Sequence, residues 1–377
     1  MTIETASVAG PARQLAREVL IHGPISRAEL GQRLGLSPAS LTRLSKPFID
    51  RGLFVDAPGS NDGALGRPAR PLDVLVDSQR FIGVKITADQ VFGVATDLRA
   101  TPLASAVVDL DGEDRHTPER VIAAIADLVA DLGGVDGITS VGVTLGGKVV
   151  RSSVADRAPF LGWRGVDLGT LVGDALGVPV IVENDVTALT AAEQWFGEAK
   201  GIDNFAVVTI GAGVGYGLVI HGHPVVTSDT GLGLGGHFPL DPTGPLCFEG
   251  HRGCSTAMLS IPSMCASARG GLGRDVGYDE LLDLAIAGDP VATAVVDAAA
   301  RALGRLIAAS ANLAMVETVV LSGEGIALAD AKLDLVVATL RADRDPEATP
   351  VRIIVDRAGF SAWARGAAAV AIQASFV

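Results

Sequence analysis

The sequence predicts an α/β protein with a small N-terminal winged helix-turn-helix and a larger body of two similar halves. Near the start, a glycine turn joins two short helical segments, and two strand-like segments around a glycine-rich loop follow them. After residue 78 the pattern changes to short strand-like runs that alternate with helical ones. A hairpin-like pair of runs recurs near residue 204, which indicates that the body repeats its own architecture.

Capping residues mark the two helices of the N-terminal domain. Ser26 and Glu29 form a capping box, in which each side chain can bond the backbone N–H of the other residue. Gly35 supplies the turn, and Ser37 followed by Pro38 is a typical beginning of the next helix. Helices of this kind, joined by a tight turn, place the second helix in the major groove of DNA.

The second helix has a core face and a break. Leu41, Leu44 and Phe48 recur at helical spacing and are expected to face the core of the domain. Pro47 has no backbone N–H, so it is expected to kink or end this helix near Lys46.

The outer face of this helix carries the expected contacts with DNA. Arginine suits guanine or phosphate, and hydroxyl groups suit bases or phosphate. The following loop ends in Gly66-Arg67-Pro68, which places an arginine at the wing, where it can enter a minor groove. The alternative is an ordinary helix pair with solvated charges. The candidate DNA-binding residues are Ser37, Ala39, Ser40, Thr42, Arg43, Lys46 and Arg67.

Charge and cysteine content limit the class of protein. The formal net charge is −13, yet residues 1–80 hold more basic than acidic residues, so nucleic acid is expected at this end only. No apolar run is long enough for a bilayer, and no signal segment opens the chain, so we expect no membrane contact. The three cysteines cannot form a disulfide framework in a chain of 377 residues, which favours the cytoplasm.

The body begins with three strand-like runs, at 81–86, 91–97 and 103–109, and continues with alternating helices and strands. This order is typical of one half of an actin-like or sugar-kinase-like fold, which is ribonuclease H-like. We expect a winged helix-turn-helix domain at 1–78 and a body at 79–377. The body would divide into one lobe at about 79–185 plus the C-terminal helix 359–377, and a second lobe at about 186–358.

Several motifs in order along the chain resemble the ROK family of repressors, open reading frames and sugar kinases, specifically its transcriptional regulators. They are Leu36-Ser37-Pro38-Ala39-Ser40, Gly66-Arg67-Pro68, Val182-Glu183-Asn184-Asp185, the glycine-rich run 209–215, Gly236-His237, and the run from Cys247 to Cys254. Together they cover nearly the whole chain.

The resemblance also identifies what has been lost. Kinases of this family carry a glycine-rich turn between the first two strands of the body, where backbone N–H groups approach the phosphates of ATP. Here that turn reads Lys85-Ile86-Thr87-Ala88-Asp89-Gln90, without glycine. We therefore expect no ATP binding and no catalysis, with Asp185 a vestigial general base. The alternative is an active sugar kinase with an accessory DNA-binding head, in which Asp185 still works as the base.

The sugar pocket implied by the resemblance is changed as well. The chain keeps Asn184, Asp185 and His237, and it has Phe160, Leu234 and Thr256 where sugar-binding relatives have polar residues. These six are the candidate effector-binding residues. The effector is then either a sugar or a less polar metabolite, or the body senses no small molecule. Asn184 and Asp185 have a plain alternative role as the cap of a helix.

A metal site is also implied by the resemblance. Relatives hold a structural zinc ion with one histidine and three cysteines, and here the corresponding residues are His237, Cys247, Glu249 and Cys254. Zinc accepts a carboxylate oxygen, and His251 is a spare imidazole in the same loop. The alternative is a glycine-rich loop without metal.

The sequence thus predicts a DNA-binding transcriptional regulator, a repressor of carbohydrate-related or other metabolic genes, with a degenerate kinase body for effector binding and dimerisation. Its partners are a double-stranded DNA operator and a small-molecule effector. A homodimer or homotetramer is expected, because a single winged helix reads only a short half-site. A permanently bound architectural DNA protein is a further alternative.

Overall fold

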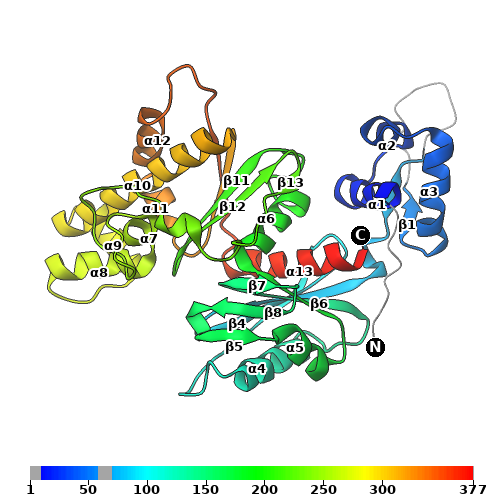
Figure 1. Ribbon diagram of the computed structural model, residues 1–377, viewed down its shortest axis with the longest axis horizontal. Helices are drawn as coiled ribbons and strands as arrows, with labels where there is room; N and C mark the ends of the chain where they lie inside the picture. Colours follow the sequence, from blue (N-terminus) through cyan, green and yellow to red (C-terminus); the bar gives the residue numbers. More distant parts are fainter. Residues whose placement is uncertain (1–9, 58–69, 377) are drawn as a thin grey trace.

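The computed structural model describes residues 10–57 and 70–376. Its N-terminal part, here called the head, combines three helices with a two-stranded antiparallel sheet (Figure 1). Ser26 caps the second helix by accepting a hydrogen bond from the N–H of Glu29, and Gly35 ends that helix at a φ of 63°. Arg67 lies outside the described residues. The head elements are α1 (Gly10–His22), α2 (Arg27–Leu34), α3 (Pro38–Asp50), β1 (Phe54–Asp56) and β2 (Leu72–Val74).

From the sequence we expect Pro47 to kink or end the second helix of the motif near Lys46, but the helix does not end there. Helix α3 continues through Pro47 to Asp50. The proline removes the N–H that would bond the carbonyl of Arg43, but both residues are exposed, so water can satisfy that carbonyl. The next residue, Phe48, stacks on Phe54 with ring centres 4.7 Å apart, and this packing holds the last turn on the core of the head.

The first sheet of the body has the strand order β10-β6-β3-β4-β5. Strands β3, β6 and β10 are parallel, whereas β4 pairs antiparallel with β3 and with β5. A small sheet of β7 (Lys148–Val150), β8 (Val154–Ala158) and β9 (Trp163–Val166) lies beside it. The main strands are β3 (Arg80–Ile86), β4 (Gln90–Thr96), β5 (Pro102–Asp109), β6 (Ile138–Leu145) and β10 (Val180–Asn184), and the helices of this half are α4 (Pro118–Asp131) and α5 (Leu168–Leu176).

The second sheet has the order β13-β12-β11-β14-β15, with β11, β14 and β15 parallel and β12 antiparallel to β11. This is the same topology as that of the first sheet, so the predicted repeat is present. Its strands are β11 (Phe205–Ile210), β12 (Val214–Ile220), β13 (His223–Pro224), β14 (Thr318–Ser322) and β15 (Arg352–Val355). The helices of the second half are α7 (Ser255–Leu259), α8 (Ile261–Leu272), α9 (Tyr278–Ile286), α10 (Pro290–Ala314), α11 (Ala327–Ala331) and α12 (Leu333–Ala342).

Two helices, α6 (Asp185–Phe196) and α13 (Phe360–Phe376), pack against each other between the sheets (Figure 1). Helix α13 covers one face of the first sheet at very short range. A Cβ atom on Gly83 would lie 1.9 Å from the carbonyl oxygen of Ala364, and one on Gly142 would lie 1.8 Å from that of Ala367. Only glycine allows this approach, so the C-terminal helix is an integral part of the first half.

The head packs directly on the body. One apolar cluster joins head residues such as Leu15 and Leu20 to Phe81 of β3, Trp195 of α6 and Phe376 of α13. The relative position of the head is therefore set by elements from the middle and the end of the chain. Within 10–57 and 70–376, no helix combines the length and apolar character needed to cross a bilayer.

Candidate DNA-binding face, effector site and metal cluster

The outer face of α3 presents a short row of polar side chains to solvent. The hydroxyl of Ser37 accepts a hydrogen bond from the N–H of Ser40 at 3.2 Å and contacts the Ser40 hydroxyl, while Thr42 donates to the carbonyl of Pro38 at 3.0 Å. These hydroxyl groups hold the first turn of the helix and remain at its exposed end. Ala39 is exposed beside them.

Two cations extend this row. Arg43 is exposed and forms no hydrogen bond or ion pair with any residue of 10–57 or 70–376. Lys46 is exposed too, and its Nζ lies 3.9 Å from an oxygen of Asp50. A free guanidinium near the N-terminal turns of a recognition helix is positioned to reach a base edge or a phosphate.

Arg27 links three segments of the head and was not singled out from the sequence. Its guanidinium donates to the carbonyl of Arg70 at 2.7 Å and to Asp56 Oδ1 at 2.8 Å. These contacts join α2 to Asp56 and Arg70, which lie on either side of residues 58–69, outside the described ranges. A single arginine at the start of a helix gives no sequence signal for such a long-range role.

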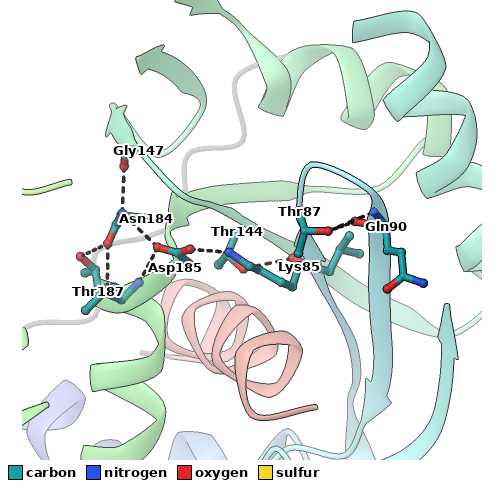
Figure 2. A network of polar contacts seen from close by, with 10 residues as sticks. Lys85, Thr87, Gln90, Thr144, Gly147, Asn184, Asp185 and Thr187 are labelled. Carbon is teal, nitrogen blue, oxygen red and sulfur yellow. Dashed lines mark hydrogen bonds and ion pairs between the residues drawn. The ribbon is translucent and has the colours of Figure 1, made fainter. Parts of the chain in front are cut away.

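Where the two halves of the body meet, Lys85 and Asp185 form an ion pair (Figure 2). Lys85 lies on β3 and Asp185 is the first residue of α6, and their side chains are only 7% and 13% exposed. Asp185 also accepts from the N–H of Val186 at 2.9 Å, and the Lys85 Nζ lies 5.1 Å from the ring centre of Trp363. The lysine therefore neutralises the carboxylate that resembles a kinase general base.

Asn184 acts as the N-cap of α6. Its Oδ1 accepts from the N–H of Thr187 at 3.0 Å, and its Nδ2 donates to the carbonyl of Gly147 at 2.9 Å (Figure 2). Both polar atoms of the side chain are thus engaged within the protein. The capping role considered from the sequence accounts for this residue in the structure.

The turn that resembles a degenerate phosphate loop is closed on itself. The N–H of Thr87 donates to the carbonyl of Gln90 at 2.9 Å, and the N–H of Gln90 donates back to the Thr87 hydroxyl at 3.0 Å (Figure 2). The Asp89 side chain is 77% exposed at the tip. Backbone donors used in this way are not available to a phosphate group.

The second glycine-rich loop, 209–215, is occupied by a carboxylate that sequence reasoning missed. A Cβ atom on Gly211 would lie 1.9 Å from Glu324 Oε2, so the Glu324 side chain rests directly on the glycine backbone. Glu324 follows strand β14, and a carboxylate in this place would repel an incoming phosphate. The signal in the sequence was an acidic residue between two glycines, Gly323 and Gly325.

The other candidate effector residues do not form a single pocket. The Phe160 ring is half exposed and lies between the two halves, 3.0 Å from a Cβ position on Gly146 and 3.8 Å from one on Gly213. Thr256 is buried against Gly236, whereas Leu234 is 67% exposed. Of the six candidates, Phe160, Asn184 and Asp185 lie together, beside Lys85: Asn184 Nδ2 donates to Asp185 Oδ1 at 3.2 Å, and a Cβ atom on Gly146 would approach both Phe160 and Asp185.

Two imidazoles and two thiols form a cluster in the 237–254 segment. One ligand atom from each of His237, Cys247, His251 and Cys254 lies within 4.8 Å of the others. The Cys247 sulfur is 3.7 Å from the Nδ1 atoms of both histidines, and the Cys254 sulfur is 3.8 Å from His237 Nδ1. Burial raises the pKa of the Cys254 thiol. The donor set fits a tetrahedral zinc site.

The fourth position of this cluster is held by His251, while Glu249 lies outside it. Gly250, at a φ of 85°, turns the chain so that the next residue points inward. Glu249 Oε2 lies 3.3 Å from His237 Nε2, on the side of the ring away from the thiols. A carboxylate in this place fixes the orientation of a metal-binding imidazole.

Comparisons with known proteins agree with this architecture. A model of the ROK family matches residues 81–374. The DNA-binding transcriptional repressor Mlc of Escherichia coli K12 is 27% identical over 304 residues, which cover 77% of this chain and 75% of Mlc. The glucokinase of Thermotoga maritima is 29% identical over 257 residues, which cover 61% of this chain and 81% of the kinase.

A crystal structure of a ROK family transcriptional regulator, a homolog of the E. coli MLC protein, is similar over almost the whole chain. The TM-score is 0.79 at 24% identity, and the match covers 97% of this chain and 95% of that one. The likeness shows that the two proteins share a fold, head included. The ROK family model also matches more than half of this sequence, so this chain belongs to the ROK family.

Proposed function

We propose that the protein is a DNA-binding transcriptional regulator, a repressor of carbohydrate-related or other metabolic genes. The observation that carries this proposal is the exposed α3 face with Arg43, which bonds no other described residue, in a head packed on a sugar-kinase scaffold. The repressor and the glucokinase among its relatives support the two parts of the proposal. The protein would act in the cytoplasm, the compartment that would also hold its DNA operator.

The proposed DNA contacts are on α3 and on the wing. Ser37, Ala39, Ser40, Thr42, Arg43 and Lys46 would enter the major groove, and Arg67 the minor groove. A homodimer or homotetramer would place two heads on a twofold-symmetric site. We also propose the domain limits 1–78 and 79–377, with α13 belonging to the first lobe, because it packs on the first sheet.

Replacement of Arg43 by alanine is expected to weaken binding to a selected operator by roughly 1–3 kcal/mol, with little change on random DNA. The operator would first be isolated from random duplexes with the full chain, and affinities measured by fluorescence anisotropy at fixed salt. Arg51→Ala is the matched control, since Arg51 is also exposed but caps the far end of α3. Equal losses on operator and random DNA would make Arg43 a phosphate contact, and failure to select any duplex would overturn the proposed function.

We propose that the body is not an enzyme. The base that resembles the kinase residue, Asp185, is paired with Lys85; the first phosphate turn is closed, and Glu324 lies in the second glycine loop. Each of these contacts opposes the binding of ATP or the removal of a proton from a sugar hydroxyl. The alternative of an active kinase with an accessory head would require all three to rearrange.

The effector would bind beside Phe160 and Asp185. It would be either a sugar or a less polar metabolite. An exposed aromatic ring next to a polar pair suits a ligand with one apolar face. Thermal shift measurements are expected to show no stabilisation by MgATP and none by micromolar glucose or N-acetylglucosamine. Release of ADP in the presence of hexoses, abolished by Asp185→Asn, would support the kinase instead.

We further propose that His237, Cys247, His251 and Cys254 hold a structural zinc ion. The zinc would fix the 237–254 segment as a rigid loop, with Glu249 orienting His237. It would have no part in catalysis, since the ligands fill a closed set of four positions.

A further inference from the structure

The head is fastened to the first half of the body by Arg99. This residue follows β4, and its side chain enters the head, where Nε donates to the carbonyl of Leu20 at 3.1 Å and Nη2 donates to that of Gly23 at 2.8 Å. Nη2 also bonds the carboxylate of Asp73. One arginine from the body thus holds both α1 and β2 of the head.

A second arginine fastens the head to the other half of the body. Arg17 lies on α1, and its Nη2 donates to the carbonyl of Gly222, in the turn between β12 and β13, at 3.2 Å. Its guanidinium carbon lies 5.4 Å from the ring centre of Trp195. Gln194 Nε2 donates to the same carbonyl of Gly222 at 2.6 Å. The head therefore contacts both halves, through different residues.

Helix α6 runs from the Lys85–Asp185 ion pair to the contacts of Arg17 with Gly222 and Trp195, here called the joint. Its first residues, Asn184 as cap and Asp185, bond Gly147 and Lys85 of the first half. Its last residues, Gln194 and Trp195, contact Arg17 and the turn at Gly222. Because a helix of this length moves as a rigid rod, any displacement at Asp185 is carried to the residues beside α1.

At the joint, one hydrogen-bond donor and one acceptor have no partner among the described residues. Arg17 Nε and Gln194 Oε1 are both buried and have no hydrogen-bond partner within the described residues, although both side chains converge on Gly222. Buried polar groups are normally paired, so a shift that brings this donor and this acceptor together would satisfy both of them.

Building on the proposed function, we propose that Arg17 is the positioning residue that transmits the state of the proposed effector site at Lys85 and Asp185 to the DNA-binding head. A ligand that displaces α6 at Asp185 shifts Gln194 against Arg17. The head, still held by Arg99, then turns relative to the first half. Arg17 touches neither DNA nor ligand in this scheme, and acts through the orientation of α1.

The test is a mutant cycle that needs no identified effector. The pair change Lys85→Met with Asp185→Asn removes the ion pair at the start of α6 without leaving a buried charge. It is expected to change operator affinity by at least about fivefold in the native background, which is a typical coupling factor. In an Arg17→Met background the same pair change is expected to have less than about a twofold effect.

Arg13→Met is the matched control, since Arg13 is an exposed arginine on the same helix, and it should leave the coupling intact. An equal shift with and without Arg17, or no shift in either background, would overturn the proposal. The same cycle read by hydrogen exchange of the amides of α1 requires no DNA. A protein that binds no DNA but shows the coupling in exchange would therefore refute the proposed function and not the role of Arg17.

Discussion

Replacement of Cys254 by serine is expected to release a bound zinc ion and to unfold the 237–254 segment. Structural zinc contributes about 10–16 kcal/mol of apparent binding free energy in small peptide sites, so its loss is large even when a folded body supplies part of the order. Wild-type protein should hold one equivalent of metal by elemental analysis, the variant none. Thermal unfolding should begin at a lower temperature in the variant, and a strong chelator should reproduce the effect in the wild type.

Substitutions of two neighbouring residues distinguish a zinc ligand from a residue that only orients a ligand. His251→Ala should lose the metal, because its imidazole is part of the cluster. Glu249→Gln should keep it with an affinity reduced about 10- to 100-fold, as for other residues that hold a ligand in place. Cys265→Ser is the control, since Cys265 lies outside the cluster. Full metal content in Cys254→Ser, or its loss in Glu249→Gln alone, would contradict this assignment.

Replacement of Lys85 by methionine is expected to lower the free energy of unfolding by about 3 kcal/mol at neutral pH, because Asp185 is then left as a buried, uncompensated charge. Adding Asp185→Asn should restore most of the loss, since neutral partners of similar size cost little at such a site. The measurement is chemical denaturation of the single and double variants.

The control for this cycle is Lys46→Met, which removes an exposed lysine whose nearest carboxylate is 3.9 Å away. Such a surface pair contributes little, and this change should leave the free energy of unfolding almost unaffected. If Lys85→Met had the same free energy of unfolding as the wild type, the ion pair would not stabilise the fold in the way that the geometry indicates.

Local features of the fold could be predicted from sequence because they depend on neighbours in the chain. The cap at Ser26 and the turn at Gly35 require only residues a few positions away, and both are present. The repeated hairpin was visible for the same reason. Pro47 misled the prediction, because the sequence alone does not show that Phe48 packs on Phe54 and holds the helix together past it.

Features of the site that depend on distant pairs could not be predicted. Lys85 and Asp185 are a hundred positions apart, and the motif showed the loss of an acidic residue but not the new partner of the lysine. The choice between Glu249 and His251 depends on one turn at Gly250, which sets which side chain points inward. Glu324 reaches the glycine loop only because β14 lies beside β11.

The packing of Phe376 has a consequence for the order in which the protein is made. Phe376, on α13, lies 6.5 Å from both Phe48 and Phe54 of the head, measured between ring centres, although the head is translated first. Domains generally fold as they leave the ribosome, but this head lacks part of its own core until α13 has been synthesised. A nascent chain that has not yet reached α13 therefore leaves uncovered the part of Phe48 and Phe54 that packs on Phe376 in the finished fold.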